Sequence, residues 1–360
     1  MSDARAPRRV LICEDSRAYA TAFSRFLERD EEIEVVGIAA SGEQAIADVE
    51  RLQPDLLTLD MQLPGMDGLE VVERLMGSRP LPIVIISAKV ARGSERAAEA
   101  LAAGALEVLA KDMLRLDHPD DLWARAMRSR LRRLSSMRVA RERIEPAAHP
   151  APPVRSLLAA PAARVIGIGA STGGPPVLAT VLGNLPADFP VPVLVVQHMA
   201  PGFIDGFGRW LDQKLPITVR VAADRGPAGP GVWLAPDGVH LQLTRSMRFA
   251  LHEEPEAAHR PSVDELLNSL ADVAGSGAVA VVLTGMGRDG AIGASAIRAA
   301  GGTVIAQNED SSVVYGMPQA VAEGGADLIA SPAEIAATLA AISRRNAPGP
   351  HPGGRPVESA

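Results

Sequence analysis

Short apolar runs separated by amphipathic stretches recur along the first half of the chain and predict alternating strands and helices. The runs consist mostly of Val, Leu and Ile, as strands buried on both faces of a parallel sheet do. Helical patterns follow the first run through Leu27, extend from Ser41 to about Leu52, and follow the third run through Leu75. A doubly wound α/β unit is therefore predicted. Its five strands are expected at residues 10–13, 33–36, 56–59, 83–86 and 107–110.

The same alternation returns after Arg164 and predicts a second α/β unit. Pro175 and Pro176 suit the first turn of a helix, where a missing N–H costs nothing. Ser262 has the residue type and position of a helix N-cap. The segment 240–243 is interpreted as the return of a strand and turn at 231–238. The other strands of this unit are expected at residues 165–168, 191–196, 278–283 and 303–306.

The composition changes between the two units. A helix that we expect to be capped near Asp117 runs through Leu134, residues 128–143 are strongly basic, and residues 146–163 are rich in Ala and Pro. A solvated helix end followed by a semi-rigid linker explains this pattern, and a functional basic patch is the alternative. The predicted division is a first domain at 1–134, a linker at 135–163, a second domain at 164–345 and a disordered tail at 346–360, which is rich in Gly and Pro.

Composition narrows the classes of protein. The 360 residues fit two domains, and the formal net charge of −7 argues against a nucleic-acid binder. Cys13 is the only cysteine, so no disulfide within the chain is possible, as in a reducing cytoplasm. The N-terminus lacks the pattern of a signal peptide, and no apolar run approaches the length that spans a membrane. We therefore expect a soluble, cytoplasmic protein.

Five polar residues stand where the strands of the first unit end. The carboxyl ends of parallel strands meet at one edge of a sheet, so these side chains are expected to lie together. Neighbouring carboxylates repel unless a cation neutralises them, and oxygen ligands suit Mg²⁺. A hydroxyl and an ammonium group opposite would bind the oxygens of a phosphoryl group. Each residue alone could be a solvated strand end. The five are Glu14, Asp15, Asp60, Ser87 and Lys111.

Three residues of the second unit are those that a serine hydrolase requires. Ser171, His198 and Asp289 each follow a predicted strand. A serine hydroxyl becomes a good nucleophile when an imidazole takes its proton, and a carboxylate behind the imidazole fixes its tautomer. Taken singly, they could be a turn serine, a core histidine and a helix cap. Their coincidence at three strand ends favours a catalytic triad.

Two other motif interpretations compete for the Ser171 turn. Gly169–Gly173 matches the nucleophile-elbow pattern G-x-S-x-G. However, α/β-hydrolases carry their triad in the order Ser, Asp, His, whereas this chain has Ser, His, Asp. A dinucleotide site would need G-x-G-x-x-G and an acidic residue after the next strand, where this chain has Gln197-His198. It remains a minor alternative.

Residues 8–134 resemble the receiver domain of two-component response regulators, a flavodoxin-like doubly wound fold. The resemblance implies that Asp60 accepts a phosphoryl group from a histidine kinase. It also implies that Glu14 and Asp15 hold Mg²⁺ together with Asp60, and that Ser87 and Lys111 sense the phosphoryl oxygens. Two positions depart from the pattern: Asp112 replaces the proline that usually follows the lysine, and Val108 occupies the position of the usual aromatic switch residue.

Residues 164–342 resemble the chemotaxis receptor methylesterase (CheB) family. The order of a receiver followed by this unit is also that of the family. Five separated motifs carry the resemblance, and such a set in order is far more specific than any one of them. They are Ala170–Gly174, Gln197–Met199, Arg260–Asp264, Leu283–Ala291 and Ser312–Pro318.

The resemblance implies a protein-glutamate methylesterase that also deamidates particular glutamines of methyl-accepting chemoreceptors, with a chemotaxis histidine kinase as phosphodonor. Ser171, His198 and Asp289 would be the triad, and the Met286 N–H and Thr172 would stabilise the oxyanion. The esterase site needs no cofactor, so Mg²⁺ belongs to the receiver. The unphosphorylated receiver is expected to cover the Ser171 edge. An alternative is a phosphorylation-dependent binding protein whose esterase site is inactive or has a non-receptor target.

Overall fold

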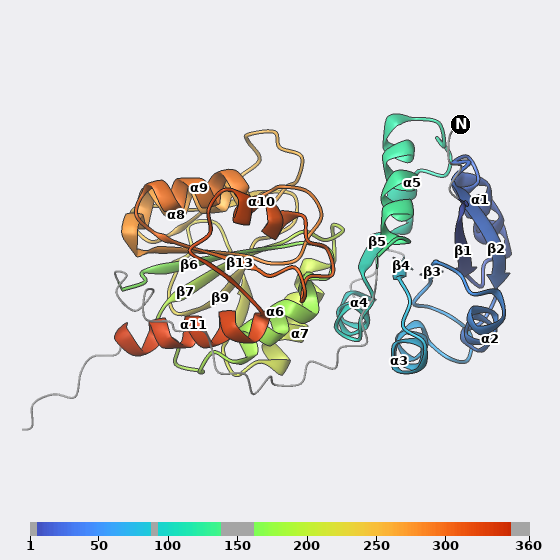
Figure 1. Ribbon diagram of the computed structural model, residues 1–360, viewed down its shortest axis with the longest axis horizontal. Coiled ribbons are helices and arrows are strands. Elements are labelled where there is room, and N and C mark those ends of the chain that lie inside the picture. The colour runs from blue at the N-terminus through green and yellow to red at the C-terminus, as the bar shows by residue number, and fades with distance from the viewer. Residues whose placement is uncertain (1–5, 88–92, 138–161, 347–360) are drawn as a thin grey trace, which may run out of the picture.

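The structure is a computed structural model that describes residues 6–87, 93–137 and 162–346 (Figure 1). The expected linker at 135–163, apart from its two ends, and the expected tail at 346–360, apart from its first residue, lie outside the described residues. Two α/β units are present, each built on a parallel sheet with helices on both faces. No helix in the described part of the chain has the length and apolar character needed to cross a bilayer.

The first unit is a five-stranded parallel sheet in the order β2-β1-β3-β4-β5. This is the flavodoxin-like order, with its switch point between β1 and β3. Helices α2, α3 and α4 pack on one face, and α1 and α5 pack on the other. The strands are β1 (Arg8–Cys13), β2 (Ile33–Ala39), β3 (Leu56–Leu59), β4 (Ile83–Ser87) and β5 (Glu107–Ala110). The helices are α1 (Arg17–Leu27), α2 (Gly42–Leu52), α3 (Gly68–Ser78), α4 (Gly93–Ala102) and α5 (Leu122–Leu134).

The second unit is a seven-stranded parallel sheet in the order β14-β13-β12-β6-β7-β9-β8. Helices α6, α7 and α11 cover one face, and α8, α9 and α10 cover the other (Figure 1). Strands β6, β7 and β12 are fully buried in the centre. The strands are β6 (Val165–Ala170), β7 (Pro192–Gln197), β8 (Val219–Val221), β9 (Gly231–Leu234), β12 (Ala278–Val282), β13 (Thr303–Gln307) and β14 (Leu328–Ala330). The helices are α6 (Gly174–Gly183), α7 (Ile204–Lys214), α8 (Val263–Ala274), α9 (Ala291–Ala299), α10 (Met317–Glu323) and α11 (Pro332–Asn346).

The structure corrects two details of the sequence interpretation. The segment β10 (His240–Leu243) does not return along β9 but pairs antiparallel with β11 (Phe249–His252) in a separate two-stranded sheet. The helix that ends the first unit begins at Leu122, because Asp121, not Asp117, accepts a hydrogen bond from the N–H of Ala124 at 2.7 Å. Ser262 is the N-cap of α8, as predicted, and accepts from the N–H of Glu265.

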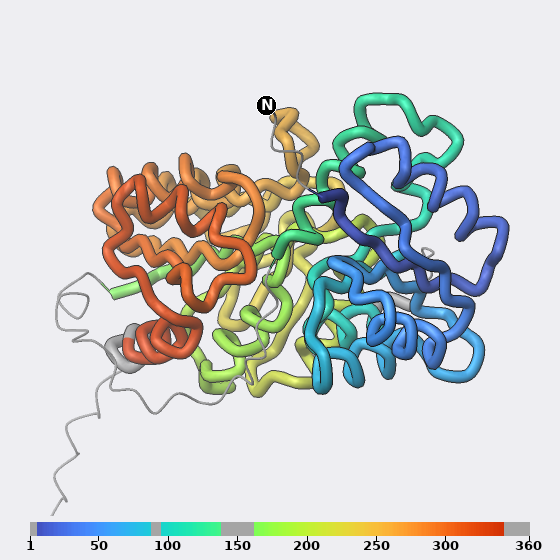
Figure 2. The backbone as a smooth tube through the Cα atoms, turned by 45° about the vertical axis from the view of Figure 1, so that its right-hand side comes forward, coloured from blue at the N-terminus to red at the C-terminus, as the bar shows by residue number. Residues whose placement is uncertain are grey.

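The two units contact each other through the β5 side of the first unit (Figure 2). Helix α4 packs against α6 and α7, and Glu95 of α4 forms an ion pair with Arg209 of α7. The N–H of Gly173 donates to the carbonyl of Leu106, just before β5, at 3.3 Å. Met286 and Val313 lie in loops of the second unit. They pack against the part of the first unit's core that α1 and α5 cover. The described contacts therefore include the turn that holds Ser171.

Candidate active site and phosphoryl site

Ser171 lies in the tight turn between β6 and α6 and is only 3% exposed. Its N–H donates to the carbonyl of Thr284 at 3.0 Å, and its own carbonyl accepts from Gly174 at 2.8 Å. Gly285 lets the end of β12 come this close, because a Cβ atom there would lie 2.8 Å from the Cβ of Ser171. The apolar run of β6 and the proline-started helix therefore fix a hydroxyl at the carboxyl edge of the sheet.

Gly173, the N-cap of α6, needs the conformational freedom of glycine. Its φ is +74°, in the left-handed region that other residues rarely adopt. A Cβ atom at this position would also lie 2.6 Å from the Cβ of Val313. The glycine-rich sequence is thus explained by backbone geometry and close packing, without a bound pyrophosphate.

His198 directly follows β7 and lies beside the Ser171 turn. Its N–H donates to the carbonyl of Ala170 at 2.9 Å, and its Nε2 lies 2.9 Å from Oδ2 of Asp289. Among the described residues, Nδ1 of His198 is buried and has no hydrogen-bond partner. With Nε2–H donating to Asp289, Nδ1 is the nitrogen that remains to act as a base.

Asp289 lies in the loop between β12 and α9, and its carboxylate is hydrogen-bonded to four groups. Oδ2 accepts from His198 and from the N–H of Val263 at 2.8 Å, whereas Oδ1 accepts from the hydroxyl of Ser262 and the N–H of Asp264, both at 2.9 Å. Burial alone would raise the pKa of Asp289, but the bonds from His198 and from the α8 amides outweigh it and hold the pKa well below the usual range. The carboxylate is therefore ionised and fixed in orientation.

A second carboxylate completes a reciprocal arrangement of helix ends. Oδ1 of Asp264, in the first turn of α8, accepts from the N–H groups of Gly290 and Gly293 at the start of α9. Asp289, just before α9, in turn satisfies the amides at the start of α8. Each helix N-terminus thus receives the negative charge that it favours. Asp289 therefore caps the start of α8 and is hydrogen-bonded to His198 with the same carboxylate.

The sequence interpretation missed His259, which stacks on His198. The two ring centroids are 4.2 Å apart and the ring planes differ by 10°. Burial and the neighbouring His198 lower the pKa of His259 to about 4. The residue immediately precedes the Arg260–Asp264 motif, but no spacing rule indicates that its ring faces another loop.

Thr172, which was predicted to help hold an oxyanion, has a suitable environment. The residue is 3% exposed, and its Oγ1 is buried with no hydrogen-bond partner among the described residues. Its carbonyl is occupied, because it accepts from Oγ1 of Thr284 at 3.0 Å. Buried polar groups are usually paired, so a free donor beside the nucleophile points to a ligand atom that it would meet.

The acidic residues of the first unit come together as predicted. Register between β1 and β3 pairs Cys13 with Leu59, which brings the following Glu14 and Asp60 side by side. One ligand oxygen each from Glu14, Asp15 and Asp60 lies within 4.8 Å of the others. Glu14 and Asp60 are buried and Asp15 is exposed. The receiver therefore has an acidic cluster typical of a Mg²⁺ site.

Lys111 reaches the same cluster from the end of β5. Its Nζ lies 2.6 Å from Oε2 of Glu14 and 2.6 Å from Oδ2 of Asp60. Burial opposes the charge of Lys111, but the hydrogen bonds to Asp60 and Glu14 raise its pKa. Burial raises the pKa of Glu14. The ring of Tyr19, which the sequence did not indicate, lies 4.6 Å from Nζ of Lys111 and adds a cation–π contact.

Ser87 closes β4 and is buried in register with Ala110, one residue before Lys111. The peptide bond from Lys111 to Asp112 is trans and leads into a 3₁₀ turn (Lys111–Leu114). Val108 is buried in β5. The departures from the usual receiver pattern therefore leave the strand ends in place.

Comparisons with known proteins match each of the two units to a protein family. The CheB methylesterase family matches residues 166–339, and the response regulator receiver domain matches residues 10–121. Protein-glutamate methylesterase/protein-glutamine glutaminase 1 of Syntrophus aciditrophicus is 40% identical over 94% of this chain and 99% of its own length. A second such protein, number 4 of Myxococcus xanthus, is 41% identical over 88% of this chain and 91% of its own length.

The crystal structure of the Thermotoga maritima CheB methylesterase catalytic domain is 40% identical and covers 50% of this chain and 98% of that chain, with a TM-score of 0.49. Family identity rests on the full-length relatives, since both units and their order are shared with them. The chain belongs to the CheB family of protein-glutamate methylesterases, with a receiver domain ahead of its catalytic domain.

Proposed function

We propose that Ser171, His198 and Asp289 are the catalytic triad of a protein-glutamate methylesterase. Its substrates are glutamyl methyl esters on chemoreceptors, and it also deamidates particular glutamines. The observation that carries the proposal is the bond of 2.9 Å between His198 and an ionised Asp289 beside the Ser171 turn. The proposed partners are methyl-accepting chemoreceptors and a histidine kinase of the chemotaxis type, and no nucleic-acid partner is proposed. A cytoplasmic location fits these partners.

In the proposed reaction, Oγ of Ser171 attacks the γ-carbonyl carbon of the ester while Nδ1 of His198 takes the hydroxyl proton. The C–O bond to the methoxy group then breaks, and His198 returns the proton so that methanol departs. Water attacks the acyl-enzyme with His198 again as base, which frees the glutamate and restores the serine. With glutamine, the first leaving group is ammonia. Asp289 keeps the Nε2–H tautomer and stabilises the imidazolium.

Two donors are proposed for the oxyanion that forms on the carbonyl. Thr172 offers a buried hydroxyl that has no hydrogen-bond partner within residues 6–87, 93–137 and 162–346. Met286 offers a backbone N–H in the loop after β12. Fixed donors stabilise the negative charge of the tetrahedral intermediate more than that of the ground-state carbonyl. Met286 also packs against the receiver, so the receiver is in contact with the loop that would complete this site.

Asp60 is the proposed phosphoryl acceptor of the receiver. Glu14, Asp15 and Asp60 would together hold Mg²⁺. The ion would neutralise charge on the carboxylates and on the incoming phosphoryl group. Lys111 already contacts the Asp60 carboxylate at 2.6 Å, and Ser87 ends the neighbouring strand. These two residues would bind the phosphoryl oxygens once Asp60 is modified.

The proposed regulation follows from the contacts of the Ser171 turn. Gly173 donates to the Leu106 carbonyl, while Met286 and Val313 pack on the receiver core. These contacts support the proposal that the receiver covers the edge where a receptor would bind. Phosphorylation of Asp60, on the same sheet as β5, is proposed to release this contact.

Substitution of Ser171 by Ala tests the proposed function. Methanol release from membranes that contain a chemoreceptor with tritium-labelled methyl esters should fall at least about 1,000-fold, since the nucleophile is lost. The control is Ser295→Ala, because Ser295 is an exposed serine of α9. Full activity of a folded Ser171→Ala protein would refute the triad.

A further inference from the structure

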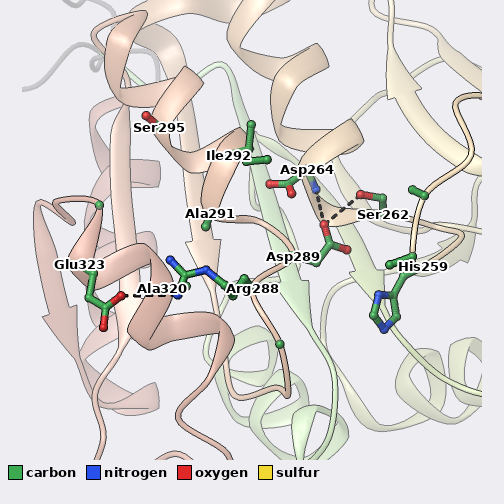
Figure 3. Close-up of a pocket in the computed structure, with 14 residues that line it drawn as sticks. His259, Ser262, Asp264, Arg288, Asp289, Ala291, Ile292, Ser295, Ala320 and Glu323 are labelled. Carbon is green, nitrogen blue, oxygen red and sulfur yellow. Dashed lines mark hydrogen bonds and ion pairs between the residues drawn. The ribbon is translucent and has the colours of Figure 1, made fainter. Parts of the chain in front are cut away.

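His259 covers one face of the catalytic imidazole without a part in the reaction described above. The rings of His198 and His259 are nearly parallel, with centroids 4.2 Å apart. In Figure 3, His259 lies on the loop ahead of α8, at the wall of a cavity of about 890 Å³ that Asp289 also lines. The imidazole of His198 thus has one contact in its plane, with Asp289, and one on its face.

These two contacts restrict different motions of His198. A single hydrogen bond at Nε2 fixes one point of the ring but leaves the ring able to tilt about that bond. A second ring stacked on the face opposes the tilt. Tilting would move Nδ1, the nitrogen that must meet the hydroxyl of Ser171, and small displacements of a catalytic group are costly to the rate.

The loop that carries His259 is held at both ends by His240. This histidine is fully buried, its Nδ1 accepts from the N–H of Ser262 at 3.2 Å, and its Nε2 lies 2.9 Å from the carbonyl of Pro255. Ser262 also binds Asp289 through its hydroxyl. One short segment therefore sets both neighbours of His198: the carboxylate in its plane and the ring on its face.

We propose that His259 is a positioning residue of the esterase site, whose ring supports the imidazole of His198 with Nδ1 directed toward Ser171. The proposal rests on the triad assigned above. Burial and the neighbouring His198 lower the pKa of His259 to about 4, with Arg130 of the receiver adding to the effect and Asp289 opposing it. His259 is therefore neutral near pH 7, and it does not repel the imidazolium that forms during acyl transfer.

The test compares a substitution that removes the ring with one that keeps a flat ring. In the tritiated-methanol assay with receptor membranes, His259→Ala should lower kcat about tenfold with KM within about twofold of the parent value, because chemistry rather than binding is disturbed. His259→Phe should retain at least about half of the parent kcat, since the stacked face remains. The control is His252→Ala, an exposed histidine of β11, which should leave both constants unchanged.

NMR spectra of the parent protein and of its variants supplement the kinetics. The carbon-bound ring protons of His198 should be shifted upfield by the ring current of His259, should stay shifted in His259→Phe, and should move downfield in His259→Ala. If His259→Ala does not fold, His259→Leu replaces it, because leucine fills the volume without a flat face. The leucine protein should then be about tenfold slower than the phenylalanine protein.

The inference is overturned if the variants without a ring keep kcat within twofold of the parent. It is also overturned if His259→Phe is as slow as a variant without a ring, or if the His198 protons of the parent show no upfield shift. Ser171→Ala, measured in parallel, separates this outcome from failure of the proposed function. An inactive Ser171→Ala beside a fully active His259→Ala contradicts only the positioning role, whereas an active Ser171→Ala contradicts the triad itself.

Discussion

Asp289 shows how a single residue can hold two roles that sequence patterns treat as alternatives. Its carboxylate accepts hydrogen bonds from the first backbone N–H groups of α8, and its Oδ2 also bonds to the imidazole of His198. The sequence indicated both a helix cap and a partner for His198 at this position, and Asp289 makes both kinds of contact. His259 was not predicted, because stacking on His198 joins two loops that lie about 60 residues apart and leaves no local pattern.

Thr172 gives the residue-scale prediction. Thr172→Val keeps the shape of the side chain and removes the hydroxyl, whose oxygen has no partner to lose among the described residues. We expect kcat for methanol release to fall about 100-fold, as when one oxyanion donor is removed, while the melting temperature stays unchanged. The matched control is Thr180→Val in α6, whose hydroxyl donates to the Pro176 carbonyl at 3.0 Å. Unchanged kcat would exclude Thr172 from the oxyanion site.

At the scale of elements, apolar runs located the strands that build both sites. Runs such as Leu56–Leu59 have no competing helical period and were predicted with the observed ends. The error at β10 arose because pairing partners are set by tertiary contacts: His240–Leu243 has a strand pattern whether it pairs with β9 or with β11. The cap of α5 was misplaced because Asp117 and Asp121 are both good N-cap residues.

The contact between α4 and α7 gives the element-scale prediction. Glu95 and Arg209 form an ion pair across the two domains. Glu95→Arg would place like charges together and weaken the contact between the two domains. Basal methanol release without a phosphodonor should therefore rise about threefold, the size of effect expected for a partly exposed ion pair. Combining Glu95→Arg with Arg209→Glu restores opposite charges and should return the basal rate to the parent value. Equal rates for the single variant and the parent would show that this pair does not hold the domains.

At the scale of the whole molecule, the β5 side of the receiver meets the loops at the carboxyl ends of strands in the second unit. The receiver contacts the other unit through α4 and the residues around β5, and the parts that it contacts include the Ser171 turn and the Met286 loop. Two doubly wound domains and their order could be predicted from the sequence, since each has its own series of apolar runs. Their mutual placement was expected only from the resemblance to the CheB family. The residue pattern does not indicate it, because interface residues such as Leu106 and Val313 have the character of any core or loop position.

Asp60→Asn gives the prediction for the whole molecule. This change removes the proposed phosphoryl acceptor 2.6 Å from Lys111 while keeping the size of the side chain. The small phosphodonor acetyl phosphate should stimulate methanol release by the parent and leave the Asp60→Asn protein at its basal rate. Asp55→Asn, a change at a carboxylate near the opposite end of β3, is the control and should be stimulated normally. Equal stimulation of Asp60→Asn and the parent would rule out regulation through this residue.

The hydrogen bond from Gly173 to Leu106 has a thermodynamic consequence under the proposed regulation. Receiver and receptor compete for one edge of the catalytic domain, and coupling between two binding equilibria acts equally in both directions. If modification of Asp60 raises the affinity for the receptor by some factor, receptor binding favours the modified receiver by the same factor. The substrate therefore acts as an effector of the receiver, because receptor binding shifts the equilibrium toward the modified form.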